Sequence, residues 1–235
     1  SPRRTTRGCA LSNCSPMPAG APKPEKKSDM SETIIHSSLL APEAQAVLDG
    51  LVAESADRYG TDRPGGARAE VDRYPPAAFV PPLGDFLVLL RDGLVVAGGA
   101  FMSHDDETAE IKRVWTHSGL RRQGLARRIM AALEARAAAL GYTRAYLTTG
   151  FRQPEAVALY LVLGFRPLFD VNADPALYRS LPFEKHIGAK AGQPGRSPLR
   201  RLARSFEEAS ADVAAIKAEQ EARILGRLAQ FAQVE

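Results

Sequence analysis

Cysteine is almost absent from this 235-residue sequence. Its only two cysteines, Cys9 and Cys14, both lie in a polar segment at the start of the chain. Two thiols cannot build a disulfide scaffold, and no second pair of ligands follows them at a spacing that would complete a zinc site. We therefore expect free thiols, a reducing compartment and a cytoplasmic location.

Long apolar runs are also missing. No run approaches the ~18 residues that span a bilayer, so we expect neither an integral membrane protein nor a membrane partner. Residues 1–30 lack the continuous apolar segment of a secretory signal, and they hold five of the 17 prolines. Such a segment cannot bury enough surface to offset its ordering entropy, so we predict that residues 1–30 form a disordered, basic, Pro-rich tail.

The net charge of +4 is unevenly distributed along the chain. Residues 1–30 carry +4, residues 31–187 carry −2 and residues 188–235 carry +2. Basic ends can touch nucleic acid weakly without defining the activity, and no zinc-finger, recognition-helix or aromatic-basic RNA-binding pattern occurs. We expect no specific nucleic-acid partner. The histidines stand apart from any cluster with ligand spacing, so we also predict no metal site.

The middle of the chain is predicted to alternate strands and helices. Apolar residues recur with helical spacing over 38–59, 124–140 and 154–163, and β-type runs cover 108–116, 143–149, 165–169 and 181–185. Residues 86–97 predict a hairpin around Asp92-Gly93, and the Gly/Pro-rich stretch 61–82 predicts a loop with a short strand near 68–71. The strand–helix–strand order predicts one parallel crossover, so we expect an α/β (α+β) domain over 31–187, with a mixed, mostly antiparallel sheet and helices on both faces.

A second helical segment is predicted after a Gly/Pro/Ser-rich linker over 188–198. Apolar residues repeat there at spacings of three and four, which predicts an amphipathic helix over 199–233. The stripe consists of Leu199, Leu202, Phe206, Ala209, Val213 and Ile216. Such a helix could dock on its own domain or pair with a partner chain, which leaves a homodimer possible.

The segment from Arg121 to Arg127, Arg-Arg-Gln-Gly-Leu-Ala-Arg, carries the chemistry. It lies between a β-type run and the start of a strongly amphipathic helix. Unpaired N–H groups and the helix dipole favour an anion such as a pyrophosphate at that position, and Gly124 would allow close approach of the backbone. The alternative is a turn with solvated arginines.

Two motifs in this region resemble the GCN5-related N-acetyltransferase (GNAT) superfamily. Residues Arg121 to Ala126 match its Gln/Arg-x-x-Gly-x-Gly/Ala motif at each defined position. Ala158-Leu159-Tyr160 and Leu163-Gly164-Phe165 match a later family signature. The resemblance covers roughly residues 33–187, and it implies a sheet splayed open between the strand ending near Thr116 and the strand over 143–149.

In this family acetyl-CoA, a co-substrate, lies in that opening. The resemblance implies that backbone groups at Val114 and Thr116 pair with its pantetheine arm and that loop amides hold its pyrophosphate. It also implies that Gln153 contacts the cofactor, although the family often has Asn there and Gln153 could instead shape the start of a helix. The implied cofactor-binding residues are Val114, Trp115, Thr116, Arg121, Arg122, Gln123, Gly124, Leu125, Ala126, Arg127 and Gln153.

Two residues are candidates for catalysis through the same resemblance. Glu110 matches the common position of the base that takes a proton from the amine, and its alternative is a strand glutamate paired with Lys112. Tyr160 matches the general acid that protonates the leaving thiolate, and its alternative is a ring packed on the helix. Oxyanion charge would be met by a backbone N–H near Val114.

The sequence thus predicts an acetyl-CoA-dependent N-acetyltransferase, an acyltransferase that works by direct transfer in a ternary complex. We expect its acceptor to be a primary amine of a small molecule, such as an amino acid, a polyamine or an amine-bearing toxin. A protein or peptide acceptor is one alternative, and a non-catalytic acyl-CoA-binding regulatory module is another. A deep, closed acceptor pocket would favour a small molecule, and an open groove would favour a peptide.

Overall fold

The computed structural model describes residues 31–61 and 66–232 of the chain. These residues belong to one structural unit, which begins at Ser31. The predictions for residues 1–30, including the thiols of Cys9 and Cys14, lie outside them. None of the described helices is long and apolar enough to cross a membrane.

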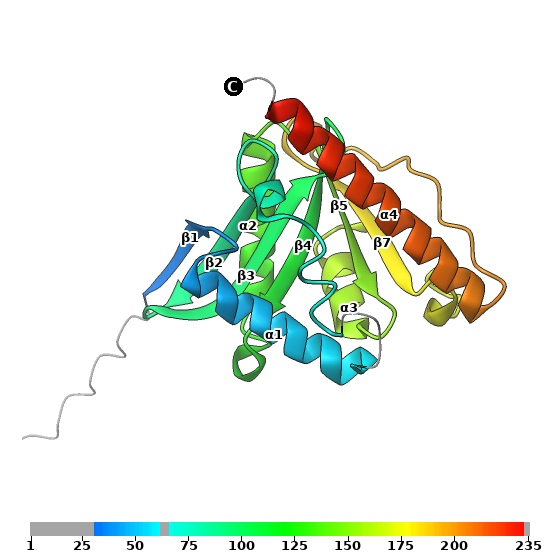
Figure 1. Cartoon of the computed structure of the whole chain (residues 1–235), viewed down its shortest axis with the longest axis horizontal. Helices are drawn as coiled ribbons and strands as arrows, with labels where there is room; N and C mark the ends of the chain where they lie inside the picture. Colours follow the sequence, from blue (N-terminus) through cyan, green and yellow to red (C-terminus); the bar gives the residue numbers. More distant parts are fainter. Residues whose placement is uncertain (1–30, 62–65, 233–235) are drawn as a thin grey trace, which may run out of the picture. The chain divides into compact units, whose positions relative to one another are not determined.

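Seven strands and four helices follow one another in the described part of the chain (Figure 1). In chain order they are β1 (Glu32–Ser37), α1 (Pro42–Tyr59), β2 (Asp85–Arg91), β3 (Leu94–Ser103), β4 (Thr108–Thr116), α2 (Leu125–Ala139), β5 (Arg144–Gly150), α3 (Pro154–Val162), β6 (Arg166–Pro167), β7 (Ser180–His186) and α4 (Phe206–Phe231). The strands form one sheet in the order β1-β2-β3-β4-β5-β7-β6. Only β4 and β5 pair in parallel, which confirms the predicted mixed and mostly antiparallel sheet.

Three differences between the sequence-based elements and the structure concern strands. Strand β1 was not predicted, because it is a short edge strand whose side chains show no clear alternation of burial. The predicted strand near 68–71 is a turn. The predicted strand 165–169 shortens to Arg166–Pro167, where Pro167 has no N–H to extend the ladder.

The helices cover the two faces of the sheet. Helices α1 and α4 lie on the face nearer the viewer in Figure 1, and α2 and α3 pack on the other face. Gly98 and Gly99 of β3 let helices approach from both sides, because a Cβ at these positions would meet Val47 of α1 and Leu133 of α2. The register with β4 shifts between Gly98 and Ala100, as at a β-bulge.

Helix α4 starts later than predicted and docks on its own domain. The Ser205 Oγ accepts a hydrogen bond from the N–H of Glu208 at 3.1 Å, an N-terminal cap that sets the start at Phe206. Leu199 and Leu202, counted in the predicted stripe, lie outside the helix and are exposed. Ala209 and Ile224 are buried against the domain, so the stripe is used within the chain.

Candidate active site

The strands β4 and β5 stop pairing with each other about halfway along their length. Their parallel register runs from Thr108 opposite Arg144 to Ile111 opposite Leu147 and ends there. Beyond this point β4 continues to Thr116 and β5 to Gly150 without pairing to each other. The sheet is therefore splayed open in its middle, as the resemblance implied.

The loop before α2 presents backbone amides at the mouth of this opening. Arg122 and Gly124 both have left-handed backbone conformations, with φ of 62° and 80°. Alternating handedness of this kind turns successive N–H groups toward a common point, which suits an anion. In the described part of the chain, none of the N–H groups from 122 to 127 donates to another backbone group, and a Cβ at Gly124 would meet open space. The residues present therefore fit the diphosphate of an acyl-CoA.

The side chains of this loop divide into anchored and exposed ones. Leu125 is buried in the core and fixes the first turn of α2. Arg121 forms an ion pair with Glu54 of α1 at 3.2 Å, and the amide oxygen of Gln123 accepts from Arg91 at 2.7 Å. Three further residues lie in this loop. Ala126 is half-buried, and Arg122 and Arg127 are exposed. The arginines add positive potential there.

The unpaired end of β4 carries the residues for which the other backbone contacts are predicted. Val114 packs beside Gly99 and Leu133 on the α2 face, whereas the Trp115 indole lies against Gly50 of α1. Thr116 is the last residue of the strand and pairs with Ala97 of β3. The edge of β4 that faces β5 is thus left without a strand partner over 112–116, where an extended ligand could add to it.

Tyr160 lies in α3 with its ring in the core. The ring is only 7% exposed and packs against Phe165 and Phe183 at centroid distances of 6.0 and 5.6 Å. Burial, and secondarily the charge of Glu54, raises the pKa of the Tyr160 phenol to about 12. The hydroxyl therefore keeps its proton at neutral pH, as a donor must, and the ring packing is the one that the alternative role describes.

Gln153 stands at the start of α3 and bonds to its own loop. Its amide oxygen accepts from the Thr149 hydroxyl at 2.7 Å and from the N–H of Gly150 at 2.9 Å. These bonds link the end of β5 to the first turn of α3. They support the alternative in which Gln153 shapes the start of the helix.

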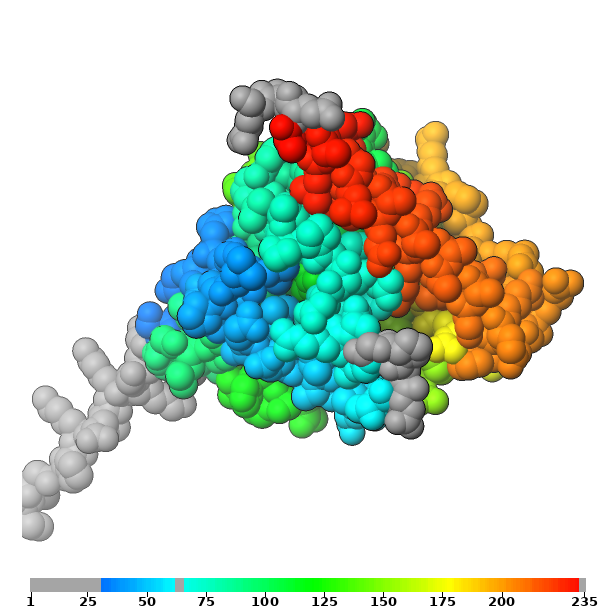
Figure 2. All heavy atoms as spheres, viewed as in Figure 1, coloured from blue at the N-terminus to red at the C-terminus, as the bar shows by residue number. Residues whose placement is uncertain are grey.

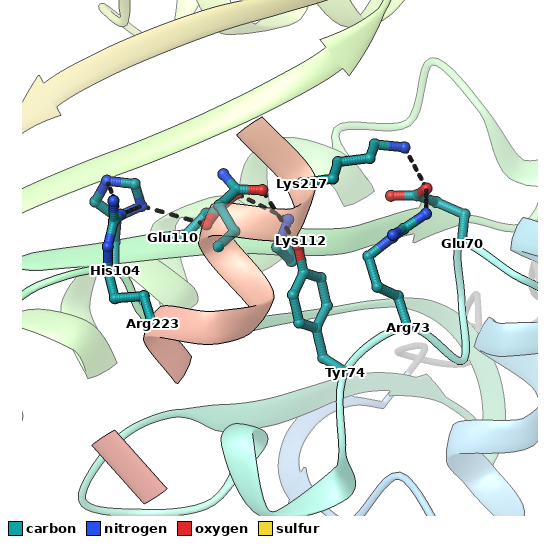
Figure 3. A network of polar contacts seen from close by, with 9 residues as sticks. Glu70, Arg73, Tyr74, His104, Glu110, Lys112, Lys217 and Arg223 are labelled. Carbon is teal, nitrogen blue, oxygen red and sulfur yellow. Dashed lines mark hydrogen bonds and ion pairs between the residues drawn. The ribbon is translucent and has the colours of Figure 1, made fainter. Parts of the chain in front are cut away.

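Glu110 lies at the centre of a buried polar network (Figure 3). Its carboxylate is 2.8 Å from the Lys112 ammonium and 3.4 Å from His104 Nδ1, and it accepts a hydrogen bond of 3.1 Å from Gln220 Nε2. Burial alone would raise the pKa of Glu110, but Lys112, and after it His104, lower this pKa to about 2. So acidic a carboxyl group is a weak base, and the geometry favours the ion-pair alternative for Glu110.

Side chains of helix α4 contact this network. Gln220 accepts a hydrogen bond from the Tyr74 hydroxyl at 3.2 Å while donating to Glu110. Lys217 of α4 pairs with Glu70, and Glu221 of α4 is 2.8 Å from Arg73. Helix α4 and the segment 66–79 therefore meet over the splayed strands, and Figure 2 shows the two in contact. Sequence reasoning missed these residues, because isolated polar residues on an amphipathic helix resemble its solvated face.

A small cavity lies under α4, at the fork where the strands part. Its volume is about 20 Å³, and its lining includes Lys112 and Thr148, the first residues beyond the last β4–β5 pair. A larger hollow of about 370 Å³ lies at the opposite, paired end of β4 and β5, around Thr108 and Arg144. The smaller cavity thus lies where the opening begins, whereas the larger hollow lies at the other end of the two strands.

Solved structures of other proteins share this fold. A Klebsiella pneumoniae protein provisionally assigned as an acyl-CoA N-acyltransferase aligns over 66% of this chain and 97% of its own, with 24% identity and a TM-score of 0.51. The PaiA N-acetyltransferase of Thermoplasma acidophilum, solved in complex with coenzyme A, covers 67% and 99% with 12% identity and a TM-score of 0.52. An acetyltransferase from Streptococcus agalactiae covers 66% and 98% with 20% identity and a TM-score of 0.50. The fold is thus that of the acyl-CoA N-acyltransferases.

The family follows from the sequence of the domain itself. Residues 53–165 match the model of the acetyltransferase (GNAT) family, a stretch that includes the 121–127 loop, β5 and α3. The chain contains a GNAT acetyltransferase domain, as its two motifs indicated. A search of curated proteins finds no significant match. The matched stretch ends before β7 and α4, so the helix over the fork lies outside it.

Proposed function

We propose that this protein is an acetyl-CoA-dependent N-acetyltransferase that moves an acetyl group to the primary amine of a small molecule. The observation that carries this proposal is the divergence of β4 and β5 beyond Ile111 and Leu147, with the free amides of the 122–127 loop at its mouth. Such an opening admits an extended acyl-CoA arm between two strands while the diphosphate stays at the start of α2. A protein with a closed sheet would need neither the divergence of β4 and β5 nor the free amides of the loop.

The acceptor side of the opening favours a small molecule over a peptide. Helix α4 and the segment 66–79 cover the fork, and Gln220 contacts Tyr74 and Glu110 across it. An extended peptide would need an open groove along the strands, which this cover occupies. In this proposal the acceptor amine enters beside α4 and meets the thioester within the opening.

Direct transfer assigns roles to groups of this chain. The acetyl thioester supplies the electrophilic carbonyl carbon, which the neutral amine attacks as the C–S bond breaks. The Tyr160 hydroxyl donates a proton to the leaving thiolate, and a backbone N–H near Val114 stabilises the oxyanion. Glu110 stays the candidate base for the amine proton, directly or through a water, although its pairing with Lys112 makes it a weak one.

The proposal is tested by thiol release from acetyl-CoA across a panel of amines. We expect amine-dependent release by the full chain, with the acetylated amine identified by mass spectrometry. Binding of acetyl-CoA without release for any small amine or peptide would show a non-catalytic acyl-CoA-binding module instead. Release with peptides but not with small amines would show that the acceptor class is wrong.

A further inference from the structure

The fork cavity is lined by an uneven set of charges. Its ionic residues are Glu70, Lys112, Arg200 and Lys217, which are one carboxylate and three cations. Lys112 is neutralised by Glu110 at 2.8 Å, and Lys217 pairs with Glu70. Arg200 forms no ion pair with a carboxylate within the described ranges 31–61 and 66–232. One positive charge beside the fork is therefore left uncompensated.

The Arg200 guanidinium is held in place by backbone groups. The Nη1 atom of Arg200 donates a hydrogen bond to the carbonyl oxygen of Ser180 at 2.7 Å. The backbone N–H of Arg200 donates to the carbonyl oxygen of Leu168 at 2.7 Å. Three residues earlier, the N–H of Ser197 donates to Glu184 at 3.3 Å, which ties the same segment to β7. Carbonyl partners orient a guanidinium without cancelling its charge, so its attraction for an anion is kept.

We propose that the fork cavity receives a carboxylate carried by the acceptor amine, with Arg200 as its charge partner. This inference rests on the proposed function and narrows its substrate class to amines that bear a carboxylate. A guanidinium presents parallel N–H groups that match the two oxygens of one planar carboxylate. A polyamine would instead bring a second positive charge next to Arg200, which is unfavourable.

The size of the cavity limits what can enter it without movement of its lining. About 20 Å³ holds a single water, so a carboxylate enters only if neighbouring side chains move. Lys217 and Glu70 can do so, because their side chains are 31% and 42% exposed. The apolar side chains of Val213 and Ile216 on α4 line the same cavity and leave no room for a second charged group.

The test compares amino acids with their matching amino amides and with diamines as acceptors of the full-length protein. For Arg200→Gln we expect kcat/KM to fall ~10- to 100-fold for carboxylated acceptors, the size of one lost charge-assisted contact, with amides changed less than ~3-fold. Arg200→Lys should restore part of the difference. Taking the ratio of the two acceptors in each variant cancels their different amine pKa values.

Arg196→Gln is the matched control, because it removes one exposed positive charge from the same segment. This variant should leave kcat/KM unchanged for both the carboxylated acceptors and the amides. An equal fall for both acceptors in Arg200→Gln would mean that Arg200 only anchors its segment, and this would overturn the inference alone. A wild-type preference for diamines would do the same. If acetyl-CoA binds but no amine of any class is acetylated, the proposed function fails and the inference with it.

Discussion

The two sides of the β4–β5 opening are built from different kinds of groups. On the α2 side, the groups that face the opening are backbone amides from one short loop, residues 122–127. On the α4 side, they are charged side chains from separate segments, such as Glu70, Lys112 and Lys217. The first set is local in sequence, and the second meets only after the chain has folded.

This difference teaches where a sequence motif can be expected. The backbone path itself requires a left-handed conformation at Gly124, so the proposed cofactor side carries a short, readable pattern. The acceptor side depends on side chains whose partners lie far away, such as Glu110 and Gln220. Each of these residues is unremarkable in its own segment. Four substitutions test how far the two sides are separable.

The largest expected effect comes from Tyr160→Phe. Loss of the proton donor should lower kcat by ~10²- to 10⁴-fold, while the affinity for acetyl-CoA is kept. Stability should change little, since no described group bonds to this hydroxyl. Tyr178→Phe is the control, because Tyr178 lies in the same core cluster and accepts a hydrogen bond from the Asp170 N–H. Steady-state kinetics with both variants decide the point, and equal kcat values for Tyr160→Phe and wild type would exclude the acid role.

Glu110→Gln separates the base from the buried ion pair. The substitution leaves Lys112 without its carboxylate, which should cost ~3 to 5 kcal/mol of unfolding free energy at pH 7. Because the folded pKa of Glu110, about 2, lies below its ordinary value of 4.5, its stabilising contribution is complete above about pH 4.5 and is lost as pH falls toward 2.

Urea unfolding at several pH values measures this contribution, and the variant should lack it. The activity arm uses the pH–rate profile of the residual turnover. A profile with the wild-type shape would remove Glu110 as the base, and loss of the acidic limb would support that role.

Gly124→Leu tests the backbone cradle. A side chain at φ 80° is strained and would project into the space before α2, so acetyl-CoA affinity should fall ~10- to 100-fold. Gly141→Leu is matched, because Gly141 also has a positive φ with open space but lies beyond the other end of α2. Calorimetric titration with acetyl-CoA should show the loss only for Gly124→Leu. Equal affinities for the two variants would refute the cradle.

The smallest effect is expected at the rim of the acceptor side. Glu221→Gln breaks the ion pair with Arg73. The side chain of Arg73 is 24% exposed and that of Glu221 is 38% exposed. Such a pair contributes less than ~1 kcal/mol, so thermal unfolding should shift slightly and acetyl-CoA affinity should not change. A large loss of stability would show that α4 is held mainly by its charged contacts rather than by Ile224 and the other buried groups.

The fold was predictable to a large extent. Helices α1, α2 and α3, the Asp92-Gly93 hairpin and the single parallel crossover all follow from local periodicity and turn residues. Edge strand β1 was not predictable, since its pairing with β2 is decided by partners 49 to 59 residues away. The start of α4 was misjudged because the apolar stripe continues before the capping residue Ser205.

By itself, the sequence determined the loop that we propose as the cofactor side of the opening, because a helix start and a left-handed glycine are consequences of local backbone geometry. Only the tertiary structure decided the acceptor side. There the charge state of Glu110 depends on Lys112 and His104, and Arg200 comes to the fork from a segment outside the family match. Electrostatic effects depend on distances in space, and those distances are not written in the spacing of residues along the chain.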